Sequence, residues 1–161
     1  MEKLHIQRLK CLGNSLKIAM KNEWKSNTKK ARNSFSYSKE ELIAYELLVE
    51  NFDVVKRQYK CKRYPFKCDF YIPSIDTFIE YNGIWTHGNH PYDSQNAEDI
   101  KRLEEMRAKA ENSEYYRSAI NTWTIADPLK RNTAKTNNLK YIECWNLDDI
   151  RDFIHSSSSS K

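Results

Sequence analysis

Two carboxylates, Asp69 and Glu80, lie on either side of a short turn in the segment CDFYIPSIDTFIEYNG, residues 68–83. We expect Asp69 on one strand and Glu80 near the end of the next, so a hairpin can bring the two carboxylates side by side. Two adjacent carboxylates with open positions for water suit Mg²⁺, a hard cation that prefers oxygen ligands. Alternation along the second strand puts Glu80 on the same face as Phe78, which is unusual for a solvated glutamate. The alternative is that both acids are ordinary surface residues.

A third acid, Glu41, lies at the start of a predicted helix. Ser38 and Glu41 form a capping box, with Ser38 as the N-cap. At about 100° per residue, Glu41 falls at the edge of the apolar stripe that includes Ala44 and Leu48. Glu41 therefore either accepts a hydrogen bond from a backbone N–H at the start of the helix, or joins the other acids at a site, or does both.

A histidine, His87, follows in the sequence WTHGNH, in a loop that leaves directly from the strand of Glu80. A neutral imidazole can act as a general base on water or bind a metal ion. His90 comes shortly after it. A metal site built on His87 and His90 is therefore a separate hypothesis, and a solvated loop histidine is the simplest reading.

These residues resemble the pattern of the PD-(D/E)xK nuclease superfamily. In chain order they are Glu41, Asp69, Glu80-x-Asn82 and His87. Within that superfamily, residues 38–145 look most like the very-short-patch mismatch-repair endonuclease and the phage homing endonucleases related to it. The segments YPFKCDFYIP and FIEYNGIWTHG carry this similarity. A second pattern, further along the chain, also resembles these enzymes. It consists of Trp123, Thr124, Asp127, Lys130, Ala134, Asn138, Leu139, Ile142 and Trp145.

The resemblance implies an α/β fold of the restriction-endonuclease type. We expect a mixed β-sheet with the helix of Glu41 on one side and the helix of Asp127 on the other. It also implies cleavage of double-stranded DNA that depends on Mg²⁺, with Mn²⁺ able to substitute. A phage-type homing endonuclease is the specific expectation.

Each matched residue takes an expected function from the resemblance. Asp69 and Glu80 would bind the metal ion, and Glu41 would orient a metal-bound water. His87 would accept or relay a proton, and Asp127 matches a later aspartate of the same active site.

One position departs from the family pattern, because the lysine of the ExK motif is Asn82 here. An amide can be neither a base nor a cation. The mismatch-repair branch also lacks this lysine and uses a histidine. Lys130 or Lys67 could supply the missing positive charge near the scissile phosphate.

The net charge of +5 is unevenly distributed along the 161 residues. Residues 1–37 hold nine Lys and Arg against two Glu, a net of 9 − 2 = +7, and residues 38–161 hold 18 against 20, a net of −2. Such an arm suits contacts with DNA phosphates, and the alternative is a solvated basic helix. The candidate DNA-binding residues are Lys17, Lys21, Lys25, Lys29, Lys30 and Arg32.

The elements that must position these residues follow from the sequence pattern. The division predicted is a basic arm over 1–37, a nuclease-type domain over 38–155 and a disordered tail over 156–161. Residues 26–37 read as a linker and 84–97 as a loop, and 113–123 either continue the preceding helix or form another. We expect helices over 4–11, 14–25, 38–51, 97–111, 127–138 and 147–155, and strands over 54–59, 66–72, 77–81 and 139–145.

Several classes of protein are excluded or disfavoured. The sequence contains neither an apolar run of 18 residues nor a secretory signal, so we expect no membrane partner and a cytoplasmic location in a bacterial or phage-infected cell. The four cysteines form no C-x₂-C pair, which disfavours a structural zinc site. Two further functions remain open besides the histidine–metal nuclease: a DNA-binding module without catalysis, and a mismatch-repair or defence nuclease. A single site would nick one strand unless the protein forms a homodimer or rebinds.

Overall fold

The computed structural model describes residues 38–158. These residues belong almost entirely to the second of the two units into which the chain divides, which begins at Lys39. The predicted helices over 4–11 and 14–25, the linker and the six basic residues of the arm all lie outside the described residues. No helix among residues 38–158 is long and apolar enough to cross a membrane.

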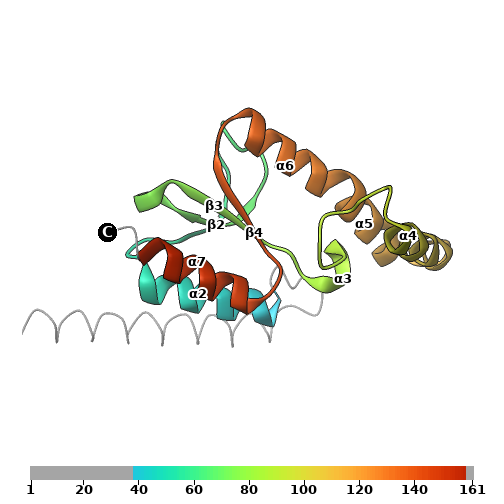
Figure 1. Cartoon of the computed structure of the whole chain (residues 1–161), viewed down its shortest axis with the longest axis horizontal. Helices are drawn as coiled ribbons and strands as arrows, with labels where there is room; N and C mark the ends of the chain where they lie inside the picture. The colour runs from blue at the N-terminus through green and yellow to red at the C-terminus, as the bar shows by residue number, and fades with distance from the viewer. Residues whose placement is uncertain (1–37, 159–161) are drawn as a thin grey trace, which may run out of the picture. The chain divides into compact units, whose positions relative to one another are not determined.

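The described part is a mixed α/β fold (Figure 1). Its helices are α2 (Lys39–Asn51), α3 (Ile84–His87), α4 (Ala97–Ala110), α5 (Glu114–Asn121), α6 (Asp127–Thr136) and α7 (Leu147–Ser158). Its strands are β1 (Lys56–Tyr59), β2 (Cys68–Ile72), β3 (Thr77–Tyr81) and β4 (Lys140–Cys144). The predicted order of a helix, three strands, helices, a strand and a helix is confirmed.

The four strands form one sheet in the order β1-β2-β3-β4. The pairs β1–β2 and β2–β3 are antiparallel, whereas β3 and β4 run parallel. The turn between β2 and β3 is a single 3₁₀ turn, Pro73–Ile75, and it ends at Asp76 in the left-handed conformation, with φ of 46°. This tight connection fixes the register of the hairpin that carries the two central carboxylates.

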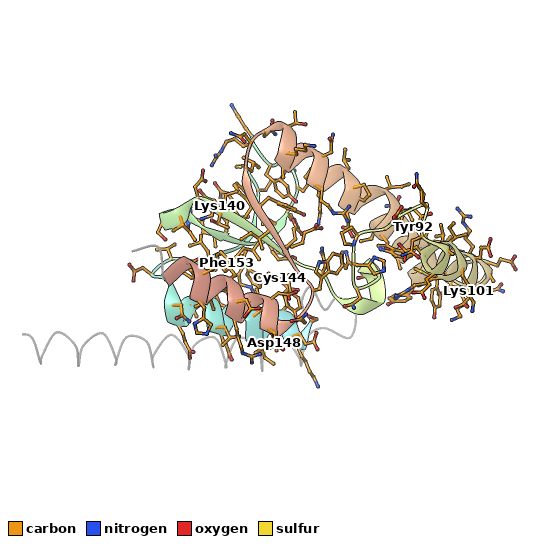
Figure 2. The ribbon with its side chains drawn as sticks, viewed as in Figure 1. Tyr92, Lys101, Lys140, Cys144, Asp148 and Phe153 are labelled. Atoms are coloured by element: carbon orange, nitrogen blue, oxygen red, sulfur yellow. The ribbon has the colours of Figure 1, made fainter. Side chains whose placement is uncertain are left out.

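Helices cover both faces of the sheet. On one face, α2 and α7 form a core cluster with apolar residues of β2, β3 and β4, to which Cys144 of β4 and Phe153 of α7, both labelled in Figure 2, belong (Figures 1 and 2). On the other face, Ala134 of α6 packs on a cluster that includes Tyr64 and Phe78. The expectation that the helix of Glu41 and the helix of Asp127 lie on opposite sides is therefore confirmed.

Two local expectations were wrong. The predicted loop over 84–97 contains a helical turn, α3, which ends at Gly88 with φ of 73°. The helix predicted to begin at Asp127 does begin there, and a π-helical turn over Thr122–Ala126 joins it to α5 without a break. There the N–H of Asp127 donates to the carbonyl of Thr122. The next residue, Pro128, has no N–H of its own to donate. At the other end of the chain, α7 runs to Ser158, past the predicted end at His155.

Candidate active site

The two central carboxylates lie side by side on the α6 face of the sheet. Phe70 pairs with Ile79 in the antiparallel ladder, so continuing the register by one residue sets Asp69 opposite Glu80. Directly opposite residues of an antiparallel pair project from the same face. The predicted adjacency of the two acids is thus a consequence of the hairpin register.

Glu80 is almost completely buried, with 1% of its surface exposed. The hydroxyl of Tyr64 donates to its Oε1 at 2.7 Å, and the ammonium of Lys130 donates to its Oε2 at 2.7 Å. Burial, followed by the charge of Asp69, raises the pKa of Glu80 to about 7, although both donors act in the opposite direction. The positive charge of Lys130 is therefore not enough to offset the cost of ionising both Asp69 and Glu80 at this site.

Asp69 is held by two donors. The backbone N–H of Tyr81 donates to its Oδ2 at 2.9 Å, and the side-chain amide of Gln58 donates to its Oδ1 at 3.1 Å. Burial raises the pKa of Asp69, and the charges of Lys130 and His87 offset part of this rise. Lys130 and His87 therefore lie close enough to Asp69 for their charges to act on it.

The predicted histidine and the later aspartate form a dyad. His87 Nδ1 lies 2.6 Å from Oδ2 of Asp127, and the carboxylate is buried, with 2% of the side chain exposed. A carboxylate on Nδ1 favours the imidazole form that carries its proton there, which leaves Nε2 as the acceptor. The dyad can therefore orient His87 for proton transfer at Nε2.

The same helix supplies the positive charge. Asp127, Lys130 and Ala134 recur at helical spacing, so they share the stripe of α6 that faces the sheet. Burial acts to lower the pKa of Lys130, but the nearby charge of Glu80 and its hydrogen bond hold that pKa above its ordinary value. Asp127 contributes in the same direction, so Lys130 stays an ammonium between the acid pair and the dyad.

The loop after His87 is anchored at several points. Gly88 packs directly on the indole of Trp123, since a Cβ at this glycine would lie 2.2 Å from Cε2 of the ring. The guanidinium of Arg102 donates to the carbonyl of Gly88 at 3.1 Å, and Trp123 Nε1 donates to the carbonyl of His90 at 2.9 Å. The chain on the C-terminal side of His87 is therefore fixed against α4 and the π-helical turn.

His90 is not part of the acid cluster. Its Nε2 lies 3.1 Å from the buried carboxylate of Asp99, and its Nδ1 lies 2.9 Å from the carbonyl of Pro91. Because each ring nitrogen has a partner of its own, the geometry disfavours a metal site shared with His87. Tyr92, labelled in Figure 2, continues this loop and packs edge-on against Trp123.

A carboxylate that the sequence analysis missed extends the row of acids. Glu143 of β4 pairs with Glu80 in the parallel register, so Asp69, Glu80 and Glu143 cross three neighbouring strands. Arg131 Nε donates to both oxygens of Glu143 at 3.0 and 2.9 Å, and the amide of Asn82 donates to Oε1 at 3.0 Å. The alternation of residues in KYIEC indicates which face of the strand Glu143 occupies. Nothing in the sequence around Glu143 indicates a catalytic or metal-binding function.

The remaining predicted residues are Glu41 and Lys67. Glu41 is buried, with 9% of its surface exposed, at the start of α2. None of the contacts that the structure describes for Asp69 or Glu80 is made by Glu41. Lys67 is exposed, so Lys130 takes the place that both lysines could have filled.

The donor set fits a hard divalent cation. Mg²⁺ is commonly bound by one or two carboxylates together with water, and Asp69 and Glu80 supply two oxygen ligands on adjacent strands. The buried Glu80 and the partly buried Asp69 both have raised pKa values, which favours an added positive charge beside them. Asp127 Oδ1 is also buried and has no hydrogen-bond partner within residues 38–158, so it remains an acceptor for water. Among those residues, no group of three or more His, Cys, Asp or Glu side chains is arranged around a common metal position.

Comparison of the chain with models of protein families, with curated proteins and with solved structures gives no match.

Proposed function

We propose that the protein is a Mg²⁺-dependent DNA endonuclease of the PD-(D/E)xK type. The observation that supports this most strongly is the cluster around the acid pair of Asp69 and Glu80. Lys130 contacts Glu80 directly and acts on Asp69 through its charge, and the charge of His87, which pairs with Asp127, also acts on Asp69. Five of the six residues expected from the resemblance are thus neighbours, although they come from four separate elements.

The fold is compatible with this proposal. A mixed four-stranded sheet with α2 and α6 on opposite faces is the arrangement that the resemblance implies. The helix order and the parallel β3–β4 pair carry Lys130 and Asp127 over the sheet face of the acid pair. These features support a restriction-endonuclease-like architecture.

Asp69 and Glu80 would hold the metal ion. Bound there, Mg²⁺ would polarise the scissile phosphate and lower the pKa of an attacking water. Each carboxylate oxygen has a second lone pair beyond the one used by its present donor. The four donors around the two acids therefore orient the carboxylates without consuming their capacity as ligands.

His87 would be the general base. Asp127 holds Nδ1, so Nε2 is free to take a proton from water as the phosphodiester is attacked. The carboxylate of Asp127 also stabilises the imidazolium that results. A catalytic lysine at position 82 is then unnecessary, and Asn82 instead supports Glu143.

Lys130 would offset the negative charge that develops on the phosphate. Its ammonium is already desolvated beside Glu80, and a cation in such a site stabilises charge more strongly than one in water. Glu41 would orient water from the start of α2, as the resemblance implies. This completes the expected set of catalytic residues.

Within this class we favour a homing endonuclease of the phage type that acts on double-stranded DNA in the cytoplasm. The basic residues of the arm would contact phosphates, which gives affinity without sequence readout. Cutting both strands would then require a homodimer or successive binding events, because residues 38–158 carry one such site.

The proposal is tested with supercoiled plasmid and phage genomic DNA, incubated with Mg²⁺, with Mn²⁺ or with EDTA. Asp69→Asn removes one charge from the pair while keeping an oxygen for the N–H of Tyr81. Asp76→Asn is the matched control, because Asp76 is exposed at the other end of the hairpin and pairs with Arg63. We expect cleavage by the wild type and Asp76→Asn with either metal, and none by Asp69→Asn or in EDTA.

Calorimetric titration with Mg²⁺ accompanies the cleavage assay, because a narrow sequence requirement could hide the activity. Mg²⁺ binding that Asp69→Asn abolishes supports the proposal even when neither DNA is cut. A wild type that neither binds Mg²⁺ nor cuts DNA overturns it, as does cleavage that is equally fast in EDTA. Metal binding lost in His87→Ala but retained in Asp69→Asn would favour the histidine–metal nuclease instead.

A further inference from the structure

Tyr64 is completely buried between β1 and β2, at a position to which the proposed function assigns nothing. Its backbone is locked in a tight turn, in which Tyr64 and Cys61 exchange N–H to carbonyl hydrogen bonds of 3.2 and 3.1 Å. The amide of Asn137, next to the C-terminal end of α6, donates to the carbonyl of the neighbouring Arg63 at 2.6 Å. The position of the Tyr64 backbone is therefore fixed from two sides.

The ring of Tyr64 is also fixed. It packs against Phe66, Phe78 and Tyr141, with centroid distances of 5.2, 5.5 and 5.8 Å. Three aromatic neighbours leave the ring no room to turn away from Glu80, because cores are packed about as densely as organic crystals. The hydroxyl is thus delivered to Oε1 of Glu80 at 2.7 Å by a rigid support.

A buried tyrosine hydroxyl usually finds a partner, so this contact could be only the satisfaction of a polar group. The character of the partner indicates more. Glu80 is itself buried and is one of the two ion-binding carboxylates of the proposed site. Tyr64, in the connection between β1 and β2, donates to one oxygen of Glu80, and Lys130 of α6 donates to the other. The two donors together fix the orientation of the carboxylate.

We propose that Tyr64 is a positioning residue that holds Glu80 in the orientation that binds the divalent cation. This inference rests on the proposed function and deepens it. Groups that hydrogen-bond to a metal ligand fix its orientation, and their loss typically weakens metal affinity by about 10- to 100-fold. Tyr64 touches neither substrate nor metal, and it acts only through Glu80.

The test is Tyr64→Phe, which removes the hydroxyl and keeps every ring contact. Tyr71→Phe is the matched control, since Tyr71 belongs to the same aromatic cluster but donates to the exposed Asp76 at 2.8 Å. Mg²⁺ affinity is measured by calorimetry in the absence of DNA. DNA affinity in EDTA and the midpoint of thermal unfolding are measured alongside.

We expect Tyr64→Phe to bind Mg²⁺ about 10- to 100-fold more weakly than the wild type. DNA affinity in EDTA should be unchanged, and cleavage should recover at high Mg²⁺ concentration. Tyr71→Phe should bind Mg²⁺ as the wild type does. This pattern separates positioning from a general loss of structure, which would lower DNA affinity and the unfolding midpoint as well.

Equal Mg²⁺ affinity in Tyr64→Phe and the wild type overturns the positioning function while leaving the proposed nuclease intact. An equal loss in Tyr71→Phe overturns it too, because the effect would then belong to the aromatic cluster. A wild type that fails to bind Mg²⁺ overturns the proposed function and this inference with it. The two failures are therefore distinguishable.

Discussion

The ionisation of Glu80 should make the metal-free protein less stable as pH rises. Burial and the charge of Asp69 raise the pKa of Glu80 from 4.5 to about 7 in the folded protein. The folded state therefore holds this proton more tightly than the unfolded state does. Stability is highest below the unfolded pKa and falls as pH rises through the folded value. Glu80→Gln removes the ionisation and keeps the shape of the side chain.

The magnitude follows from the two pKa values. Each pKa unit corresponds to about 1.36 kcal/mol, so the rise from 4.5 to about 7 costs the ionised, folded protein about 3 kcal/mol. Most of this cost appears between pH 5 and pH 8. We expect the free energy of unfolding of the wild type to fall over this range by about 2 to 3 kcal/mol more than that of Glu80→Gln.

The assay is urea unfolding in EDTA at several pH values, followed by circular dichroism. Glu46→Gln serves as the control, because Glu46 is exposed on α2 and the substitution changes the net charge by the same amount. Differences between pH values are used, since the loss of the Lys130 contact lowers the stability of Glu80→Gln at every pH. Parallel pH profiles for the wild type and Glu80→Gln would refute the reasoning, and so would a wild type that gains stability relative to the variant towards pH 8.

Three further outcomes follow from the site. Asp127→Asn replaces the carboxylate at His87 Nδ1 with an amide, so the turnover rate should fall by about 100-fold or more while DNA affinity in EDTA stays unchanged. Single-turnover kinetics measure this rate, and a normal rate would exclude the dyad from catalysis. Gly88→Ala should lower the free energy of unfolding by about 3 kcal/mol or more, because the residue has φ of 73° and its new Cβ would meet the ring of Trp123; urea unfolding measures this, and a variant as stable as the wild type contradicts the packing. Mg²⁺ at about 100 times its dissociation constant should stabilise the wild type at pH 8 by about 2.7 kcal/mol but leave Asp69→Asn unchanged, as thermal unfolding can show; equal stabilisation of both would place the ion elsewhere.

Local patterns were sufficient to predict much of the sheet. The strand over 77–81 was predicted with its observed bounds, because TFIEY lies between a turn and Asn82-Gly83. The short turn before it made the adjacency of Asp69 and Glu80 predictable as well. Alternation along a strand and the length of a hairpin are local properties, so they can be read from one segment.

The parts that were missed depend on contacts between distant segments. Tyr64 meets Glu80 because Phe78 of β3 and Tyr141 of β4, together with the nearby Phe66, fix its ring. Glu143 joins the row of acids only through the parallel pairing of β4 with β3. Alternation within KYIEC assigns Glu143 to one face of its strand, but the spacing within neither segment indicates which residues it contacts. The choice between Lys67 and Lys130 also required the packing of α6 on the sheet.

The π-helical turn makes the length of the chain between α5 and α6 as important as its composition. A π-helical turn holds one residue more than an α-helical turn, because its N–H groups donate to carbonyls five residues back. Removing one residue, for example the 60% exposed Ile125, would let this turn close with α-helical hydrogen bonds, so α6 would keep its face toward the sheet. An added residue has no such outlet, because each residue advances a helix by about 100°. An insertion before Asp127 would therefore turn Asp127 and Lys130 away from the sheet together, although neither had been altered.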